Sequence, residues 1–483
     1  MTAANDDYLR RVEAMSSDRQ LLLARLRAKG AAAVPPPSRR PEHLVRAPLT
    51  PAQEYLWHFC RNQPPGDPTR NITVASRLDG VLDVDALRRA LDALVANAEA
   101  LRTAFPSADG RPYQLVEAPG PADLTFDDLT GLPVADREKV AWELVNEHDL
   151  NGAFDLATGP LFRTRIIRLA ETSHVLSISV HHIICDGTGF YLICENLAHL
   201  YRAACDGAPL TVPATLGQAD YAWWLREHYL PSSEMTRHLD YWRTQLDGAQ
   251  PASLPMDRPR PATPNYEGTY YRHRCAGDLP RMIAQACQDN GATPLMIVVA
   301  AFAAIVTQQS GSTDFVFTTD TPGRGRTDWE NVIGLFVNTL FLRMKTEGDP
   351  TFARLVERAR NVLLDAWSHD AAPAQEVLEA VRPGTLHGTS PLSNMTIQFL
   401  EGQTGAAGLT LPGLKATSLE LVLHRSRRDL SLSVMELNTG IEFWIEYSTY
   451  LFDDQRIHEL LARLERVLVA GAINPELPLS RLG

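Results

Sequence analysis

The sequence predicts an α/β fold with mixed sheets, divided into two lobes. At 483 residues the chain exceeds the size at which one hydrophobic core keeps growing, so two or more domains are expected. Strand patterns at residues 162–169 and 174–182 precede a helical pattern, and an apolar helical pattern at residues 294–308 precedes a strand at residues 314–317. Helices and strands therefore mix in both halves, and we expect two mixed lobes that meet near residues 207–220.

Local signals delimit parts of the first lobe. Asp83 has a side-chain oxygen that can accept a hydrogen bond from a free backbone amide, so it is expected to cap a helix running to about residue 98. Polar residues 170–173 separate the two strands. Gly187 and Gly189 end the second strand, and a helix is expected to follow them.

The N-terminal part of the chain differs from the rest. Apolar residues at helical spacing, mixed with arginines, predict one or two short amphipathic helices between residues 8 and 29, which either pack on their own domain or dock to a partner. The proline-rich residues 30–38 are typical of a linker. The expected division is residues 1–47 as helical segment and linker, 48–215 as N-terminal lobe and 216–483 as C-terminal lobe.

Composition disfavours several classes of protein. The formal net charge of -12 argues against nucleic acid as a partner. Six cysteines without a C-x-x-C pair suggest neither a zinc site nor a disulfide framework. No secretory signal is visible at the N-terminus, and the longest apolar run, residues 295–306, is shorter than the roughly 20 residues that cross a bilayer. A cytoplasmic protein without a membrane span is expected.

Residues 181–187, with the sequence HHIICDG, are the strongest candidate for chemistry. Strand alternation would place His182 on one face and His181, with Ser177 and Ser179, on the other, so the two histidines should not share one role. Adjacent strand positions cannot readily chelate one metal, and no third ligand stands at a suitable spacing, so a metal site is disfavoured. Each histidine is then either catalytic or a core residue with one nitrogen satisfied by backbone.

The Asp-Gly pair that follows favours a catalytic role. Asp186 and Gly187 lie at a strand-to-helix turn, where the free amides and positive dipole end of the next helix can stabilise an oxyanion. His182 is the candidate base if it faces a substrate channel, since a histidine can accept a proton from an amine or alcohol; His181 would be structural. Asp186 could orient the histidine, but we favour an arginine bond that holds the turn.

Other catalytic signatures are missing from the sequence. It contains no G-x-S-x-G elbow, no phosphate-binding P-loop and no Rossmann fingerprint, which disfavours serine hydrolases, kinases and dehydrogenases. Residues 323–326, with the sequence GRGR, are interpreted as a surface or inter-lobe loop.

Several segments, taken in order, resemble one family. Residues 181–187 fit the HHxxxDG motif of the condensation-domain superfamily of nonribosomal peptide synthetases, and residues 49–57 (LTPAQEYLW) look like its opening motif. Residues 99–105 (EALRTAF) resemble the end of its second motif, although Asn97 and Ala98 stand where the family usually has Arg-His. Further similar segments lie at residues 219–224, 254–261, 333–340, 369–373 and 428–431, so the resemblance covers about residues 17–483.

The resemblance implies two chloramphenicol-acetyltransferase-like lobes in a V-shaped arrangement with a central tunnel. Through this tunnel the phosphopantetheine arms of acyl or peptidyl carrier proteins would reach His182 from opposite sides. The implied activity is transfer of an acyl or aminoacyl group from a carrier thioester to an amine or hydroxyl, without a covalent acyl-enzyme and without an intrinsic cofactor. The phosphopantetheine arm would act as the substrate carrier, and a small amine or alcohol is a possible acceptor.

The resemblance also implies roles for single residues. His182 would take the proton or position the nucleophile, and Gly187 would supply an amide near the oxyanion. Arg102 is the first choice as the partner of Asp186 and Arg324 the second, and Asn338 is a structural or tunnel candidate. The loop with Arg324 and Arg326 and the cluster Arg425, Arg427 and Arg428 are candidate patches for docking a carrier protein, because the overall charge of the chain would repel an acidic one.

Three alternatives stay open. A related epimerase usually has Ser-Trp soon after the Asp-Gly, where residues 188–190 read Thr-Gly-Phe. A non-catalytic module that recruits carriers or tailoring enzymes would keep the fold, but the intact His182, Asp186 and Gly187 argue against it. A coenzyme A-dependent acyltransferase would share the fold too. No carrier or adenylation segment follows Gly483, so the chain is expected to meet its carrier as a separate molecule.

Overall fold

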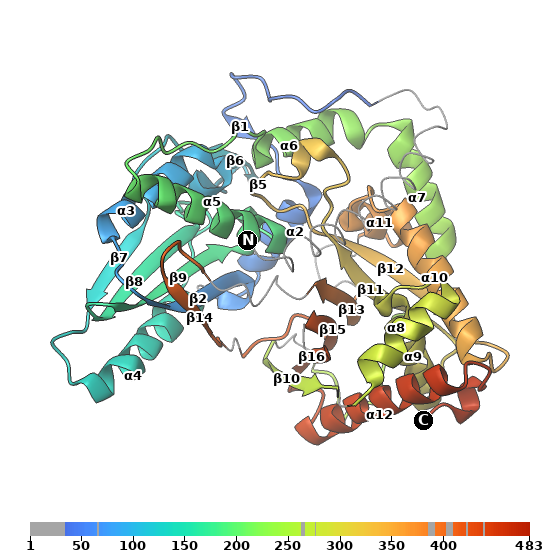
Figure 1. The fold of residues 1–483 in the computed structure, drawn as a ribbon. Helices are drawn as coiled ribbons and strands as arrows, with labels where there is room; N and C mark the ends of the chain where they lie inside the picture. Colours follow the sequence, from blue (N-terminus) through green and yellow to red (C-terminus); the bar gives the residue numbers. More distant parts are fainter. Residues whose placement is uncertain are drawn as a thin grey trace.

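Two β-sheets, each covered by helices, form the two lobes of the molecule (Figure 1). The computed structural model describes residues 34–64, 67–261, 266–275, 277–384, 392–401, 409–421, 424–437 and 440–483. The helices expected at residues 8–29 lie outside the described residues.

The first lobe is built on a five-stranded sheet in the order β14-β2-β9-β8-β7. Its strands are β2 (Asn71–Asp79), β7 (Leu124–Asp128), β8 (Phe162–Ala170), β9 (Ser173–His181) and β14 (Lys415–Leu419). β9 lies between β2 and β8 and is antiparallel to both, whereas β7 and β8 are parallel. The strand expected to end at residue 182 therefore ends one residue earlier.

Helices cover both faces of this sheet. α3 (Val84–Asn97) and α5 (Gly187–Cys205) share one apolar core with Leu176, Ile178 and Val180 of β9, and α4 (Val134–Leu144) packs on the other face. α3 has the predicted cap, because the amide of Ala86 donates to the Asp83 carboxylate at 2.8 Å. Both the helix after Asp83 and the helix after Asp186 are confirmed.

The second lobe is built on a six-stranded sheet in the order β10-β16-β15-β13-β11-β12. Its strands are β10 (Gly268–Arg274), β11 (Asp314–Thr321), β12 (Asn338–Lys345), β13 (Met395–Glu401), β15 (Leu430–Leu437) and β16 (Gly440–Ser448). The helices of this half are α6 (Gln218–Trp224), α7 (Ser233–Leu246), α8 (Leu279–Asn290), α9 (Pro294–Ser310), α10 (Phe352–Ser368), α11 (Ala374–Val381) and α12 (Asp454–Ile473).

The apolar run of the sequence lies in α9, as expected. Its residues from Leu295 to Val306 are all buried in the core of the second lobe, which explains their composition. Among the residues that the structure describes, no single helix is long and apolar enough to cross a membrane. The bent pair α8 and α9, with 99° between them, meets the length and composition criteria only together.

The two halves of the chain are interlocked. β14 comes from the range assigned to the C-terminal lobe, yet it pairs antiparallel with β2 in the first sheet. The sequence division at residue 215 therefore does not coincide with sheet membership, because a strand pairs with any edge that it can reach. Figure 1 shows β14 beside β2, between the two lobes.

The proline-rich segment is packed against the body of the protein. The indole of Trp224 donates to the carbonyl of Pro35 at 2.8 Å, and Arg40 forms ion pairs with Glu99 at 2.9 Å and Asp220 at 2.8 Å. Ordered pairing begins before residue 48, in β1 (Arg46–Ala47), which pairs with β6. The remaining elements of this half are α2 (Pro51–Arg61), β3 (Thr103–Ala104), β4 (Ser107–Ala108), β5 (Arg111–Pro112) and β6 (Gln114–Val116).

Candidate active site

His181 ends β9 and is locked in the interior. Its side chain is 4% exposed. The amide of Ile183 donates to its Nδ1 at 3.1 Å, so the ring proton of the neutral imidazole sits on Nε2, which lies 3.6 Å from the Sγ of Cys60. Burial, followed by the nearby His182 and Arg70, lowers the pKa of His181 to about 3. A neutral, doubly engaged ring of this kind is a packing residue.

His182 has a different environment from its neighbour. The chain leaves the strand here and forms a short 3-10 turn, His182–Ile184, so the alternation argument for the direction of His182 does not apply. The two rings nonetheless differ, because the side chain of His182 is only half-buried. Its Nδ1 is buried and has no hydrogen-bond partner among the described residues. Because this nitrogen is buried, an approaching group would meet the other ring nitrogen, Nε2.

The protonation state of His182 is set by its surroundings. Burial is the largest influence, and the positive charges of Arg427 and Arg70 come next; together they lower the pKa of His182 to about 4. The imidazole is therefore neutral at pH 7 and can accept a hydrogen bond. A low pKa also makes it a weak proton acceptor, which favours positioning of a nucleophile over full proton abstraction.

The carboxylate of Asp186 holds the turn between His182 and α5. One oxygen, Oδ1, accepts from the amide of Gly189 at 2.7 Å and so caps α5. The other, Oδ2, accepts from the guanidinium of Arg324 at 2.8 Å and from the amides of Phe336 at 2.8 Å and Val337 at 2.9 Å. With four donors and 2% exposure of its side chain, Asp186 does not orient a histidine.

Arg324, the second choice, is the arginine that pairs with Asp186. Its guanidinium is buried, donates also to the carbonyl of Val332 at 3.1 Å and lies 4.4 Å from the centre of the Phe336 ring. The GRGR segment is thus an inter-lobe loop, and Arg324 is not available as part of a docking patch. Arg326 in the same loop is partly exposed and pairs with Asp328 at 3.2 Å.

Arg102, the first choice as partner of Asp186, is wrong. Its guanidinium donates to the carbonyl of Glu117, and the amide of Glu117 donates back to the carbonyl of Arg102 at 2.8 Å. This reciprocal pair keeps the side chain at the β3–β6 end of the first lobe. A contact with backbone 15 residues further along the chain, next to the paired strands β3 and β6, could not be predicted from the motif alone.

Gly187 is the first residue of α5, so its amide has no acceptor within the helix. A methyl group at this position would meet no atom within 4 Å. The space over the helix N-terminus is therefore open to an approaching group. The amide dipoles of the helix give this end a partial positive charge, which suits a developing oxyanion.

Asn338 acts on the backbone. Its Nδ2 donates to the carbonyls of Asp370 at 2.9 Å and Ala372 at 2.7 Å, and its Oδ1 accepts from the amide of Ala374 at 2.9 Å. These bonds fasten the start of β12 to the first turn of α11. Of the two roles expected for Asn338, structural or tunnel-lining, these bonds support the structural one.

Two close backbone approaches support the inter-lobe loop and were not predicted. Gly323 has φ +67°, and a Cβ there would lie 1.8 Å from the carbonyl oxygen of Phe336. A Cβ on Gly334 would lie 1.9 Å from the Oε1 of Gln218. Only glycine fits at residue 323, where the obstacle is backbone, whereas at residue 334 the side chain of Gln218 would have to move. A glycine in a sequence does not reveal which segment approaches it.

Arg70 and Arg427 were not connected with His182 by the sequence. Arg70 immediately precedes Asn71, which is paired with His181 in the β2–β9 ladder. Arg70 and His182 lie just beyond this end pair, each in a short 3-10 turn. The sequence shows only an arginine just before a strand. The pairing of that strand with β9 is needed to place the arginine near the candidate site.

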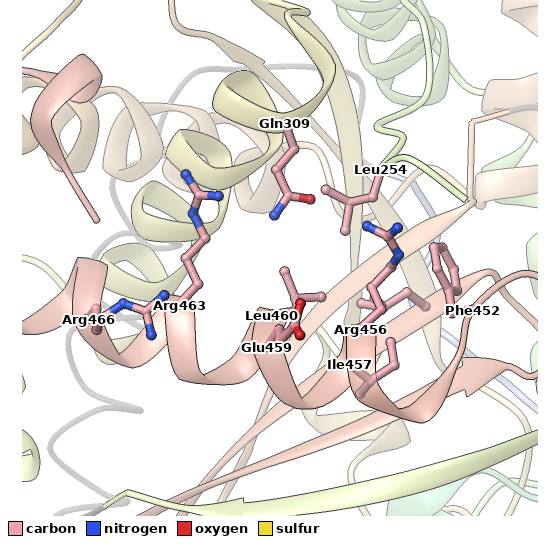
Figure 2. A pocket seen from close by; sticks show the side chains of 10 residues that line it. Leu254, Gln309, Phe452, Arg456, Ile457, Glu459, Leu460, Arg463 and Arg466 are labelled. Carbon is pink, nitrogen blue, oxygen red and sulfur yellow. The ribbon is translucent and has the colours of Figure 1, made fainter. Parts of the chain in front are cut away.

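Two cavities lie away from the 181–187 turn. One of about 280 Å³ lies on α12, and Figure 2 shows Gln309, Arg456 and Arg463 around it. Another, of about 410 Å³, lies between residues 94–102, α5 and residues 331–333. Within the described part of the chain, no group of three or more His, Cys, Asp or Glu residues is arranged to hold a metal ion.

The fold and this site are those of a two-lobed α/β protein with a histidine site at the contact between the lobes. Comparison with known proteins identifies its family. The Condensation domain family model matches residues 45–483, and the chain belongs to this family. It is 32% identical over 482 residues to phosphinothricin tripeptide synthetase PhsC of Streptomyces viridochromogenes, covering 99% of this chain and 44% of that protein. With chondramide synthase cmdD of Chondromyces crocatus it shares 33% identity, over 92% of this chain and 11% of that protein.

The chain is much shorter than these curated relatives. It spans 6% of the length of malpinin synthetase of Mortierella alpina and 44% of that of PhsC. The activities of those whole proteins are therefore not carried over to this chain.

Solved structures agree in fold. The X-domain from teicoplanin biosynthesis has a TM-score of 0.81 and 30% identity, covering 92% of this chain and 98% of that one. The same kind of domain has been solved in a complex with OxyB, with a TM-score of 0.80. SgcC5 protein from Streptomyces globisporus gives a TM-score of 0.72 at 26% identity, covering 89% and 100%. The expected chloramphenicol-acetyltransferase-like fold with mixed sheets is confirmed.

Proposed function

We propose that this chain is a condensation enzyme of nonribosomal peptide or hybrid natural-product biosynthesis. It transfers an acyl or aminoacyl group from the phosphopantetheine thioester of a carrier protein to an amine or hydroxyl. The observation that carries the proposal is the half-buried His182, whose Nε2 makes no hydrogen bond to the described residues, in a turn whose Asp186 is fully hydrogen-bonded. The family membership of the chain supports the same reaction class.

The proposed reaction uses few groups of the protein. The neutral imidazole of His182 accepts a hydrogen bond from the nucleophile and aims its lone pair at the thioester carbonyl. The C–N or C–O bond forms, the C–S bond breaks, and the proton lost by the nucleophile ends on the departing thiol. The amide of Gly187 faces the oxyanion of the tetrahedral intermediate. No intrinsic cofactor takes part.

The proposed partners are acyl or peptidyl carrier proteins, whose arms enter through a tunnel between the lobes, with a small amine or alcohol as a possible acceptor. A cytoplasmic location, where unpaired thiols such as Cys60 and Cys185 persist, belongs to the same proposal. Because Arg324 is buried in the inter-lobe ion pair, the proposed docking patches reduce to Arg326 and to the Arg425, Arg427 and Arg428 cluster.

A second candidate function is a binding module without catalysis. It is favoured by the similarity to the teicoplanin X-domain, for which a complex with OxyB is known. The intact His182, Asp186 and Gly187 count against it, because a module that only binds a partner does not need a half-buried histidine side by side with the first turn of a helix. A coenzyme A-dependent acyltransferase of the same fold is the other alternative.

The deciding experiment is intact-mass analysis of loaded carrier proteins incubated with this chain and candidate amines and alcohols. We expect transfer of the acyl group with the unaltered chain and none with His182→Ala. The matched control is His199→Ala, since His199 is exposed on α5. Equal turnover by His182→Ala would reject catalysis at this histidine, turnover of acyl coenzyme A alone would favour the transferase, and binding of a carrier without turnover would favour the recruiting module.

A further inference from the structure

Two arginines from different parts of the chain lie close to His182. Asn71 and His181 form the end pair of the β2–β9 ladder, and Arg70 and His182 are the residues that lie just beyond it in the two segments. Arg427 comes from the segment just before β15 in the second half of the chain. The guanidinium of Arg70 stacks on Phe59 at 4.2 Å, and the Phe59 ring lies 5.3 Å from the ring of Tyr266. The carbonyl of Tyr266 accepts at 2.7 Å from the amide of Ser426, the residue before Arg427. These contacts bring the two arginines to one side of the site, where both charges act on His182. The histidine is therefore flanked by two like charges.

Arg70 lacks a counter-ion within the described residues. Its guanidinium stacks on the ring of Phe59 at 4.2 Å, and its Nε is buried without a hydrogen-bond partner. Burial, followed by the charge of Arg427, lowers the pKa of Arg70 to about 10. Holding a cation away from water beside another cation costs free energy unless an anion compensates it.

Two other arginines with little exposed side-chain surface are compensated by carboxylates. Arg324 pairs with Asp186 at 2.8 Å, and Arg165 pairs with Asp127 at 2.5 Å and with Asp149 at 3.2 Å. The overall charge of the chain is -12, so acidic residues are plentiful. Among the described residues, none of these carboxylates forms an ion pair with Arg70.

Arg427 differs from its neighbour in the same way. The guanidinium of Arg428 donates to the carbonyl of Ser393 at 3.1 Å and lies 3.8 Å from Asp320. For the exposed Arg427, the described residues supply a bond only to its backbone amide, from which Glu446 accepts at 3.4 Å. The side chain of Arg427 thus remains available to a ligand.

We infer that Arg70 and Arg427 bind an anionic group, a carboxylate, on the substrate that reaches His182. The inference rests on the proposed function and names a class of substrate for it. The phosphate of the phosphopantetheine arm is not this anion, because the phosphate and the thioester are at opposite ends of the arm and the thioester is the end that reacts. The carboxylate belongs either to the acyl donor or to the acceptor.

The same arrangement couples binding to chemistry. The two arginines hold the pKa of His182 low, and a bound carboxylate would offset their charges and raise it again. A substrate with the carboxylate would therefore meet a stronger proton acceptor than a neutral substrate. The preference for substrates with a carboxylate over neutral substrates would therefore appear in kcat as well as in binding affinity.

The test uses the full chain and substrates that differ only in charge. In the acceptor arm, glycine is compared with glycinamide against one neutral acyl thioester of N-acetylcysteamine. In the donor arm, the succinyl thioester is compared with the succinamoyl thioester against one neutral amine. For each protein, kcat/KM for the carboxylate substrate is divided by kcat/KM for the amide substrate. The amines of glycine and glycinamide differ in basicity, so the quantity compared is the change of this ratio from the unaltered chain to each variant.

The variants are Arg70→Gln, Arg427→Gln and the matched control Arg88→Gln, whose arginine is exposed on α3. We expect the ratio to fall about 10- to 100-fold in one arm for Arg70→Gln, the size of a lost charge-assisted hydrogen bond, and to fall for Arg427→Gln too. It should not change for Arg88→Gln.

Arg427 is exposed, so its variant tests the idea even if Arg70→Gln fails to fold. Losses that are equal for charged and neutral substrates would overturn the inference and indicate a general effect on the oxyanion.

A binding measurement separates this inference from the proposed function. N-hexanoylglycine and succinic acid monobutylamide are compared with their primary amides by calorimetry. A carboxylate preference of about 10-fold or more that Arg70→Gln removes would support the site even if no substrate is turned over, in which case only the proposed function fails. Turnover without a carboxylate preference in either arm, or equal binding of acids and amides, would overturn the inference alone.

Discussion

Asp186 of the first lobe and Arg324 of the second form an ion pair of 2.8 Å in which the two side chains are 2% and 5% exposed. The same carboxylate oxygen accepts two amides of the second half, those of Phe336 and Val337. The turn that places His182 is thus fixed across the inter-lobe contact. The geometry of the candidate site and the relative position of the lobes are consequently linked.

Asp186→Asn is expected to destabilise the protein and to lower its turnover. The amide group of an asparagine would turn a donor toward Arg324 or toward the backbone amides, and Arg324 would keep a buried charge without a counter-ion. Removing one partner of a buried pair costs about 3–5 kcal/mol. Urea unfolding, monitored by tryptophan fluorescence, measures this loss.

The control for this variant is Arg326→Gln in the same loop. Its pair with Asp328 joins side chains that are 40% and 37% exposed, so its loss is expected to cost about 0–1 kcal/mol. If Asp186→Asn is as stable as Arg326→Gln, the ion pair does not hold the turn in the way we describe.

His181→Ala is expected to lower stability by about 1–3 kcal/mol. The change leaves the buried amide of Ile183 without its acceptor and removes a ring that packs edge-on against Phe154 at 6.2 Å. The melting temperature and the soluble yield should both fall. A variant with full stability but no turnover would instead assign the catalytic role to His181.

The parts of the fold that were predicted correctly depend on local patterns. Asp83 and the apolar spacing after it lie within one helix, and β8 and β9 are joined by a short polar turn, so neighbouring residues specify each of them. β14 depends on the exposed edge of β2, far away in the sequence. No local pattern indicates which of two sheets a strand will join.

The candidate site shows the same limit. The strand, turn and helix around residues 181–187 could be predicted because they are consecutive. The partner of Asp186 is separated from it by 138 positions, and the choice between Arg102 and Arg324 depended on contacts that the sequence does not reveal. Arg70 was missed for the same reason, since its place beside the end pair of the β2–β9 ladder depends on which strands pair.

Acid is expected to destabilise the protein through its buried neutral histidines. His238 and His369 lie with their Nδ1 atoms 2.9 Å apart, and burial is the main reason why the pKa of each is lowered to about 4. An unfolded histidine has a pKa of about 6.5. Between these values the unfolded chain binds more protons than the folded one, so the stability contributed by neutral burial is lost as the pH falls from about 7 toward 4.

The experiment compares the free energy of unfolding at pH 7.0 and pH 5.5 for the unaltered chain and for His238→Leu. Each such histidine contributes up to about 1.4 kcal/mol per pH unit to the slope, so removing one should flatten it. His199→Ala, at an exposed position, should leave the slope unchanged. Identical slopes for all three proteins would show that the folded-state pKa of His238 is not depressed.

Arg70→Gln is expected to raise the pKa of His182 from about 4 toward its ordinary value. Burial remains as the larger cause of the low pKa, and so does the charge of Arg427, so the rise should be partial. Titration of the histidine ring signals by NMR measures it, with His182→Ala identifying the signal. Arg88→Gln is the control of equal charge change, because Arg88 is exposed on α3 and is not among the charges that shift the pKa of His182. Because the charge of Arg70 lowers the pKa of His182, a carboxylate that binds at Arg70 should raise this pKa in the unaltered chain. The same ligand should raise it much less in Arg70→Gln. An unchanged pKa in Arg70→Gln would mean that Arg70 does not act on the candidate catalytic histidine, whatever its effect on stability.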